Sequence, residues 1–213
     1  MDIQQRLTGF AMMGATWIMW LLVALSVGGV AVALERAVYL IRTNENVRKL
    51  KQQILALLRE GNVEEARAQL SRSPSHVASI IAAGLENTGD GTASAEERMN
   101  GATQLAKLRM EKRLAFLGTL GSNAPFIGLL GTVIGIIRAF HSLNDAAGKV
   151  TAGLMSEVGE ALVATAIGIL VALPAIAFYN AFQRIIKGRL ARAQAFGNDV
   201  LALLKAERPS VGA

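Results

Sequence analysis

The sequence contains no cysteine and only two histidines, His76 and His141. The absence of cysteine excludes a disulfide framework, a thiolate metal site and a cysteine nucleophile. The histidines are far apart in the chain, and neither belongs to a spacing typical of metal ligands. A glycine-rich phosphate loop is also missing. The sequence therefore predicts neither an enzyme nor a protein that holds a metal or another cofactor.

Charged residues are absent from three long segments, residues 11–34, 115–137 and 161–183. An apolar helix of more than about 18 residues, rising about 1.5 Å per residue, can cross the roughly 30 Å hydrocarbon layer. We therefore predict an all-α integral membrane protein with three transmembrane helices. A cleaved signal peptide ending near Ala31-Val32-Ala33 is the alternative for the first segment. The length of that segment and the basic residues after it argue against cleavage.

Basic residues are concentrated between and after these segments. Of the 22 Lys and Arg, 13 lie in residues 35–114 and six follow residue 183. Cytoplasmic segments are the basic ones in membrane proteins. Residues 35–114 and 184–213 are therefore predicted to be cytoplasmic, and residues 1–10 and 138–160 periplasmic. This topology accounts for the net charge of +6 without nucleic-acid binding, and the basic segments can attract anionic membrane lipids.

Both cytoplasmic segments are predicted to be helical. Gly61 is expected to end one helix. Ser94 and Glu97 have the spacing of a capping box. We expect the helix that begins there to run unbroken through Leu114 into the membrane. Apolar residues keep helical spacing over residues 184–205, so the last crossing should extend far into the cytoplasm.

Small residues recur at helical spacing in the second and third apolar segments. One set is Gly121, Pro125, Gly128, Thr132, Gly135 and Ala139, and the other is Ala161, Thr165, Gly168, Ala172, Ala175 and Tyr179. Steps of three and four place each set on one face of its helix. Close backbone approach across small residues stabilises helix pairs in lipid. The expected packing positions are Gly121, Gly128, Gly135, Ala161, Gly168 and Ala172.

Thr132 and Thr165 are predicted to lie at one depth in an antiparallel hairpin. Thr132 lies five residues before the second segment ends, and Thr165 lies four after the third begins, which places both about 6 to 8 Å inside one membrane boundary. Pro125 and Pro174 match in the other half, where each is expected to kink its helix. Because a hydroxyl both donates and accepts, the threonines could line a polar path. Alternatively, each bonds only to a carbonyl of its own helix.

No Asp, Glu, Lys, Arg or His lies within the three predicted crossings. Ion pathways in membranes usually contain an ionisable residue. Glu160 is the nearest, at the outer start of the last crossing, where a carboxylate also suits a helix N-terminus. If this chain helps to move protons, the titrating group must come from another polypeptide.

Two stretches carry a family resemblance: APFIGLLGTVIGII at residues 124–137, and EALVATAIG at residues 160–168 followed by ALPA at residues 172–175. They resemble the two core motifs of the MotA/TolQ/ExbB proton-channel family, and Leu34-Glu35-Arg36 resembles the exit of its first helix. Three crossings favour the ExbB/TolQ-like branch over the four-crossing MotA stators.

The resemblance implies a subunit of a Gram-negative inner-membrane motor driven by the proton-motive force. Five copies would form a ring around two helices of an ExbD- or TolR-like partner, whose membrane aspartate titrates, and a TonB- or TolA-like protein would complete the system. By motif position, Thr132 and Thr165 would face the pore and Glu160 would lie at its end. TonB-type transport, Tol-Pal and gliding systems all share this core.

Two other classes of function compete with this one. A passive membrane scaffold would use the small-residue faces only for packing and would line no ion path. A soluble helical bundle or nucleic-acid binder would use the basic segment, and salt or alkali would extract it from membranes. The three long uncharged segments argue against the soluble class.

Overall fold

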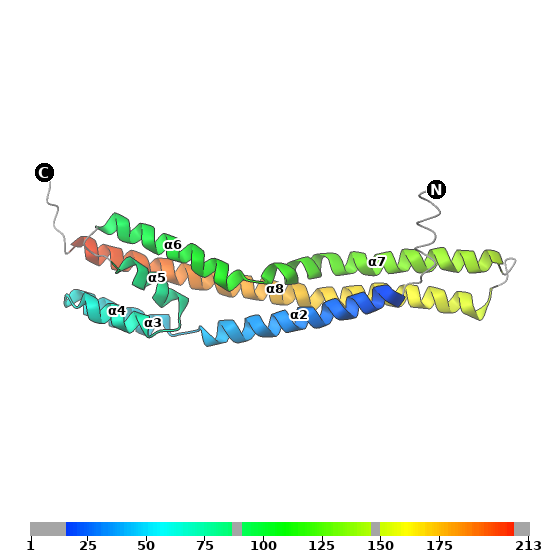
Figure 1. Ribbon diagram of the computed structural model, residues 1–213, viewed down its shortest axis with the longest axis horizontal. Helices are drawn as coiled ribbons and strands as arrows, with labels where there is room; N and C mark the ends of the chain where they lie inside the picture. Colours follow the sequence, from blue (N-terminus) through cyan, green and yellow to red (C-terminus); the bar gives the residue numbers. More distant parts are fainter. Residues whose placement is uncertain (1–15, 87–90, 146–149, 207–213) are drawn as a thin grey trace. The chain divides into compact units, whose positions relative to one another are not determined.

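The computed structural model describes residues 16–86, 91–145 and 150–206. Regular secondary structure in these residues is entirely helical (Figure 1): α2 (Thr16–Arg42), α3 (Val47–Arg59), α4 (Val63–Ser71), α5 (His76–Gly84), α6 (Thr92–Glu111), α7 (Leu114–Asp145) and α8 (Ala152–Ala206). Three apolar stretches, in α2, α7 and α8, are long enough to cross a membrane. The all-helical class with three candidate membrane-spanning helices is thus confirmed. The predicted segment 1–10 and the first residues of the first crossing lie outside the described residues.

The chain divides into two compact units. Unit 1 comprises Met1–Glu35 and Arg113–Asn180, and unit 2 comprises Arg36–Lys112 and Ala181–Ala213. Both α2 and α8 continue as helices beyond their apolar segments, to Arg42 and Ala206. The predicted helical extension of the last crossing is therefore confirmed, and α2 extends in the same way.

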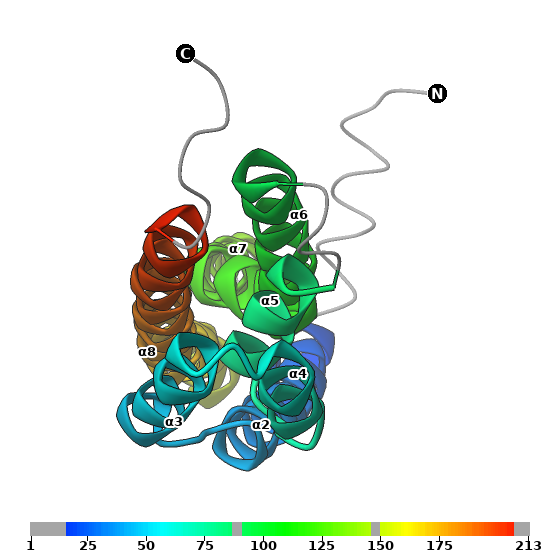
Figure 2. The same ribbon diagram turned by 90° about the vertical axis from the view of Figure 1, so that its left-hand side faces the viewer.

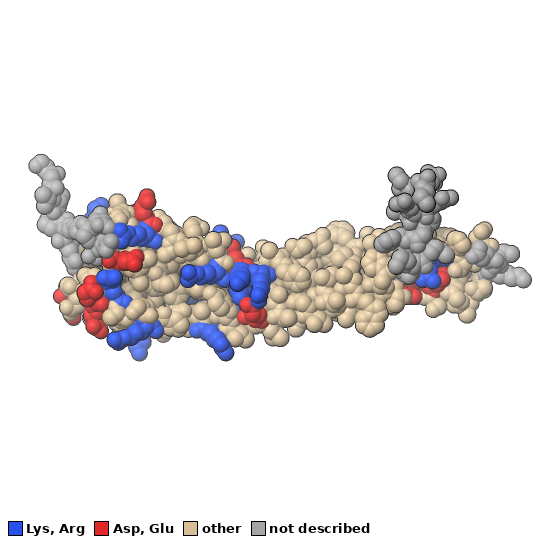
Figure 3. All heavy atoms as spheres, in the orientation of Figure 1, with Lys and Arg blue, Asp and Glu red and all other residues tan. Residues whose placement is uncertain are grey.

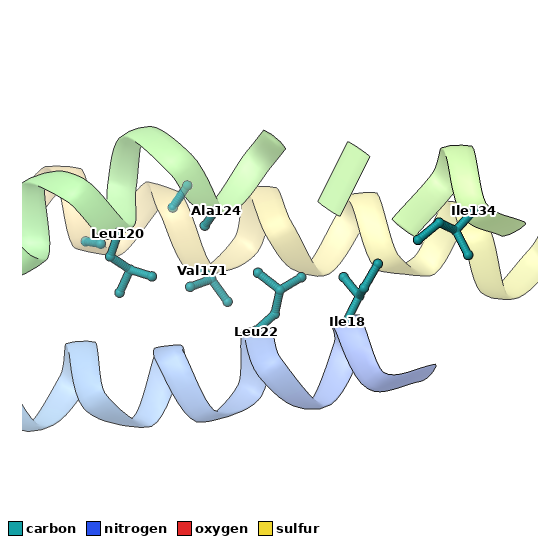
Figure 4. Close-up of a cluster of buried hydrophobic side chains, with 8 residues drawn as sticks. Ile18, Leu22, Leu120, Ala124, Ile134 and Val171 are labelled. Atoms are coloured by element: carbon teal, nitrogen blue, oxygen red, sulfur yellow. The ribbon is translucent and has the colours of Figure 1, made fainter. Parts of the chain in front are cut away.

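Unit 1 contains an apolar cluster to which all three long helices contribute. Ile18 and Leu22 of α2 point toward α7 and α8 in Figure 4, and both are fully buried. The other buried members are Leu120, Ala124, Ile134, Val171, Ala172 and Ala175. Since lipid tails are as apolar as these side chains, close van der Waals packing is what stabilises such a cluster in a membrane. The cluster holds α2 against the α7–α8 hairpin.

The helices α7 and α8 are longer than their apolar segments. Residues 138–145 and 152–160, which the sequence analysis assigned to an outer loop, are helical. The hydroxyl of Thr151 accepts a hydrogen bond from the Leu154 backbone N–H at 3.2 Å, so Thr151 caps the start of α8. Only part of the predicted loop 138–160 is therefore non-helical in the described residues.

The expected unbroken helix from Ser94 through Leu114 is wrong at both ends. The helix α6 begins at Thr92, so Ser94 lies within its first turn and is not the cap. It ends at Glu111, and α7 starts separately at Leu114. Arg113 separates the two helices with a φ of 65°, the left-handed conformation that glycine usually supplies after a helix. Its guanidinium donates to Glu35 at 2.8 Å, which stabilises this turn.

Unit 2 contains the short helices, and Figure 2 looks onto this part of the chain. Along the chain α3 packs on α4, α4 on α5, and α5 on α6. Gly61 ends the α3 region with a φ of 75°, as predicted. Charged side chains gather over unit 2 in Figure 3, whereas the visible middle of unit 1 carries almost none. This charge division matches the alternation of basic and uncharged segments in the sequence.

Candidate functional site

Thr132 of α7 and Thr165 of α8 meet between the two helices. Their hydroxyls share a hydrogen bond, and either can be the donor. The Thr165 hydroxyl also lies 3.1 Å from the Gly128 carbonyl oxygen, and the Thr132 hydroxyl lies 3.3 Å from that of Ala161. Both threonines are half-buried. The prediction that the two hydroxyls lie at one level of the hairpin is confirmed.

Each hydroxyl has one proton to donate, so the hydrogen bond between them can run in either direction. In one direction, Thr132 donates to Thr165, which donates to the Gly128 carbonyl. In the other, Thr165 donates to Thr132. Thr132 then donates to the Ala161 carbonyl or, at 3.5 Å within its own helix, to the Gly128 carbonyl. The two arrangements differ only in the rotation of two hydroxyl groups, a low-cost motion. This hydrogen-bonded chain can therefore reverse its direction without moving a helix.

Two glycines allow the threonines to meet. A Cβ placed on Gly128 would lie 2.8 Å from the Ala164 carbonyl oxygen, and one on Gly168 would lie 2.7 Å from that of Ala124. Real Cβ atoms are not found so close to backbone oxygen atoms. The backbones of α7 and α8 therefore approach each other closely beside the threonine pair, as small residues permit in membrane helices.

The other predicted packing positions also lie in buried surroundings. A Cβ on Gly121 would clash with Ile176, and one on Gly135 would clash with Ala161. Ala161 and Ala172 are themselves buried. Pro125 and Pro174 lie inside α7 and α8, where their expected kinks remain a prediction.

Glu160 is not part of the threonine cluster. Its carboxylate accepts a hydrogen bond of 2.6 Å from the hydroxyl of Thr16, at the start of α2. Five residues separate it from Thr165 on α8, a rise of about 7.5 Å along the helix. Glu160 thus connects α8 to α2, about one and a half helical turns along α8 from the threonine pair.

A second acidic residue, Glu157, was missed by the sequence analysis. Its carboxylate lies 3.4 Å from the Arg138 guanidinium and accepts a 3.0 Å hydrogen bond from Ser142. Arg138 and Ser142 are four residues apart on α7, and Glu157 is three residues from Glu160 on α8. Residues three or four apart share one face of a helix, so these spacings predict the cluster once both helices are taken to continue beyond their apolar segments. Glu157 joins α8 to α7, whereas Glu160 joins α8 to α2.

The exposed polar residues of α7 were also missed. Thr119, Ser122 and Asn123 lie within the apolar segment, and all three are exposed. Ser122 donates to the Gly118 carbonyl at 3.0 Å, and Asn123 donates to that of Thr119 at 2.9 Å. Polar side chains on a membrane helix usually face protein or water rather than lipid. This face of α7 is therefore suited to contact another polypeptide or a water-filled space.

His76 lies in unit 2, outside the apolar segments. Its Nε2 atom is 2.8 Å from the Tyr39 hydroxyl, and the Arg36 guanidinium lies 4.7 Å from the centre of the Tyr39 ring. Burial lowers the pKa of His76, and the positive charges of Arg189 and Arg109 lower it further. Within the described part of the chain, no group of His, Asp and Glu has an arrangement that could hold a metal ion.

A family model described as the MotA/TolQ/ExbB proton channel family matches residues 72–195, more than half of the chain. A putative biopolymer transport protein ExbB-like 2 of Helicobacter pylori is 50% identical over 78 residues, 37% of this chain and 52% of that protein. The Tol-Pal system protein TolQ of Pseudomonas aeruginosa is 38% identical over 96 residues, 45% of this chain and 42% of that protein. A biopolymer transport protein ExbB of Pseudomonas putida is 29% identical over 168 residues, 74% of this chain and 50% of that protein. The matched region therefore spans about half the length of these relatives.

Proposed function

The chain belongs to the MotA/TolQ/ExbB proton channel family, and from that membership we propose that it is the channel subunit of a motor in a bacterial inner membrane. In this proposal proton flow through the subunit and a partner is coupled to mechanical work in a TonB-type, Tol-Pal or gliding system. The observation that carries it is the pair formed by Thr132 and Thr165, whose hydroxyls meet between the uncharged segments 115–137 and 161–183.

The threonine pair has the properties of a relay for a partner's carboxyl group. A carboxylic acid needs an acceptor when it arrives and a donor after it loses its proton. A threonine oxygen can accept a hydrogen bond from the arriving acid. After the acid has lost its proton, a threonine hydroxyl can rotate away from the carbonyl of Gly128 or Ala161 and donate to the carboxylate. No Asp, Glu, Lys, Arg or His lies in the three apolar segments, so the acid comes from the partner, an ExbD- or TolR-like protein with one membrane-crossing helix.

A homo-oligomeric ring, a pentamer around two partner helices, is the assembly that we propose. In the most apolar stretches of the three long helices, only 22%, 28% and 33% of the residues are buried within the chain. Trp20, Phe126 and Leu170 are among the large side chains that stay exposed. Lipid can cover such side chains, but the exposed polar face of α7 at Ser122 and Asn123 is better covered by protein or water. That face lies on the side of α7 away from Thr132, and it is proposed to contact a neighbouring copy of the chain.

The proposed topology places the N-terminus and the α7–α8 connection in the periplasm and unit 2 with the C-terminus in the cytoplasm. The distribution of Lys and Arg supports this orientation. Glu160 then lies at the periplasmic end of the path, about 7.5 Å along α8 from Thr165. In this position its charge would act on protons that enter or leave.

A passive scaffold is the second candidate, and one observation favours it. Both threonine hydroxyls already have hydrogen-bond partners within the chain, including the carbonyls of Gly128 and Ala161. In a scaffold these bonds would only hold α7 to α8. Threonine-to-valine changes would then alter assembly but not proton flux.

The mass of the membrane-extracted complex tests the assembly. The chain is expressed alone and together with the products of its neighbouring genes, and each preparation is weighed by native mass spectrometry. We expect a homo-oligomer that retains a smaller protein with one crossing and a membrane aspartate. A monomer that retains no such protein would contradict the proposal and favour the scaffold.

A further inference from the structure

A groove in unit 2 lies between the end of α2 and the part of α8 that follows its apolar segment. Its volume is about 500 Å³, within the range of roughly 300–1,000 Å³ typical of small-molecule sites. The apolar lining is Leu40, Ile41, Phe182 and Ile185, and the basic lining is Arg184, Arg189 and Arg192. Ile41 is 72% exposed and Ile185 is 43% exposed, so the groove presents apolar surface beside three positive charges.

The three arginines do not serve the same purpose. Arg189 donates to the Thr43 hydroxyl at 2.9 Å and to the Leu40 carbonyl, so its guanidinium is fixed at the C-terminus of α2. Arg184 and Arg192 are exposed, and neither pairs with a carboxylate among the residues that the structure describes. Burial and the charge of Arg192 lower the pKa of Arg189. The groove therefore carries positive charge that no ion pair in the described chain neutralises; the nearest carboxylate on a shared lining is Glu45, which lines a neighbouring pocket with Arg192.

The groove begins where the apolar segment of α8 ends. Measured along the helix from Gln183, Arg184 follows after about 1.5 Å and Arg189 after about 9 Å. The headgroup region adds roughly 5 to 8 Å beyond the hydrocarbon on each side of a bilayer. Arginine side chains can also extend toward the phosphate level while their stems stay in apolar surroundings. If residues 161–183 cross the membrane, Arg184 and Arg189 lie near the depth of lipid phosphates. Arg192, about 13.5 Å beyond Gln183, reaches that depth with its side chain extended toward the N-terminus of α8.

We propose that this groove binds the headgroup of an anionic phospholipid. Arg184 and Arg192 contact the phosphate, and the exposed side chains of Ile41 and Ile185 contact the glycerol and the upper acyl chain. Uncompensated positive charge beside an apolar segment favours an anionic lipid. A different surface of a second copy is the competing occupant, which the Gly188 variant below distinguishes. The proposal rests on the membrane topology of the proposed function and is independent of proton conduction.

Native mass spectrometry of the purified complex, released from neutral detergent with added phosphatidylglycerol or phosphatidylcholine, tests the charge requirement. We expect more phosphatidylglycerol than phosphatidylcholine to stay bound. Arg184→Gln and Arg192→Gln should each weaken phosphatidylglycerol binding about fivefold, the effect of one basic residue near a lipid surface. Lys187→Gln is the matched control, because Lys187 is exposed on the same stretch of α8 and does not line the groove. Equal losses in the control and in the arginine variants would overturn the proposal.

Gly188→Leu tests the groove without changing its charge. Gly188 lines the groove, and a Cβ on it would meet no atom within 4 Å, so a leucine there fills open space without strain. We expect lipid retention to fall while the complex keeps its mass. Gly101→Leu, at another helical glycine with open space, should retain the lipid. If Gly188→Leu instead splits the oligomer and leaves phosphatidylglycerol bound, the groove is a subunit interface and the lipid proposal is wrong.

Discussion

Gly128 of α7 and Gly168 of α8 lie in contact: a Cβ on Gly128 would be 3.2 Å from the Gly168 Cα atom, and one on Gly168 would be 3.0 Å from the Gly128 Cα atom. This is backbone packing that no larger residue allows. The contact lies beside the Thr132 and Thr165 hydroxyls, and it fixes the helix separation at which they can share a hydrogen bond. The glycines thus determine the geometry of the threonine pair.

Gly128→Ala is expected to destabilise the hairpin by about 1–3 kcal/mol, as overpacking does in a tight core. The added methyl group would meet the Ala164 carbonyl oxygen, and a backbone atom cannot turn aside. Thermal unfolding of the detergent-solubilised protein measures the change. Gly159→Ala is the control on α8, where a Cβ meets nothing within 4 Å, so it should be neutral or stabilising by up to about 1 kcal/mol. Equal effects at the two glycines would contradict the close contact.

Arg138 and Glu157 are expected to show a coupling of about 1 kcal/mol in a double-mutant cycle with Arg138→Gln and Glu157→Gln. Their side chains are 29% and 20% exposed, so water screens this pair less than a surface pair. The coupling should weaken at high salt. The reference cycle uses Glu64 and Arg67, an exposed pair within α4 that should give roughly 0.3 kcal/mol. A smaller coupling energy between Arg138 and Glu157 than between Glu64 and Arg67 would show that Glu157 does not join α7 to α8 through Arg138.

Stability is expected to fall as the pH drops below about 6.5 because of His76. Burial lowers its pKa in the folded chain, so the unfolded chain takes up the proton first. The contribution of the neutral histidine is fully present above pH 6.5 and is lost as the pH falls toward the lowered value. Unfolding midpoints at pH 7.5 and 5.5 measure this loss.

His76→Gln should reduce the difference between the two midpoints, and His141→Gln is the control for removing a histidine elsewhere. If the difference between the midpoints at pH 7.5 and 5.5 is unchanged in His76→Gln but reduced in His141→Gln, the pH dependence does not come from His76.

The long apolar helices and their packing faces could be predicted because steps of three and four are visible in the sequence. Counting residues from each end of the hairpin also sufficed to place Thr132 and Thr165 at one level. The direction of their hydrogen bonds could not be predicted, since it depends on the helix separation that Gly128 and Gly168 permit. Only at that separation can the Thr165 hydroxyl lie 3.1 Å from the Gly128 carbonyl oxygen and the Thr132 hydroxyl 3.3 Å from the Ala161 carbonyl oxygen.

Other features depend on backbone conformations that the residue types do not indicate. Arg113 adopts the left-handed conformation without being glycine, so the break between α6 and α7 had no marker in the sequence. The cluster of Arg138, Ser142 and Glu157 required both helices to extend past their apolar segments. Charged residues marked the end of the predicted crossing, but they did not mark the end of the helix.

Proton flux with the threonines changed tests the central claim most directly. The complex with its single-crossing partner is reconstituted into liposomes that contain a pH-sensitive dye, and proton entry is followed after a potential is applied. The account predicts that Thr132→Val with Thr165→Val lowers flux by about tenfold or more, the factor that about 1.4 kcal/mol of lost hydrogen bonding represents. Thr132→Ser with Thr165→Ser keeps the hydroxyls and should retain flux, with the mass of the complex unchanged in both. Undiminished partner-dependent flux in the double valine variant would contradict the account.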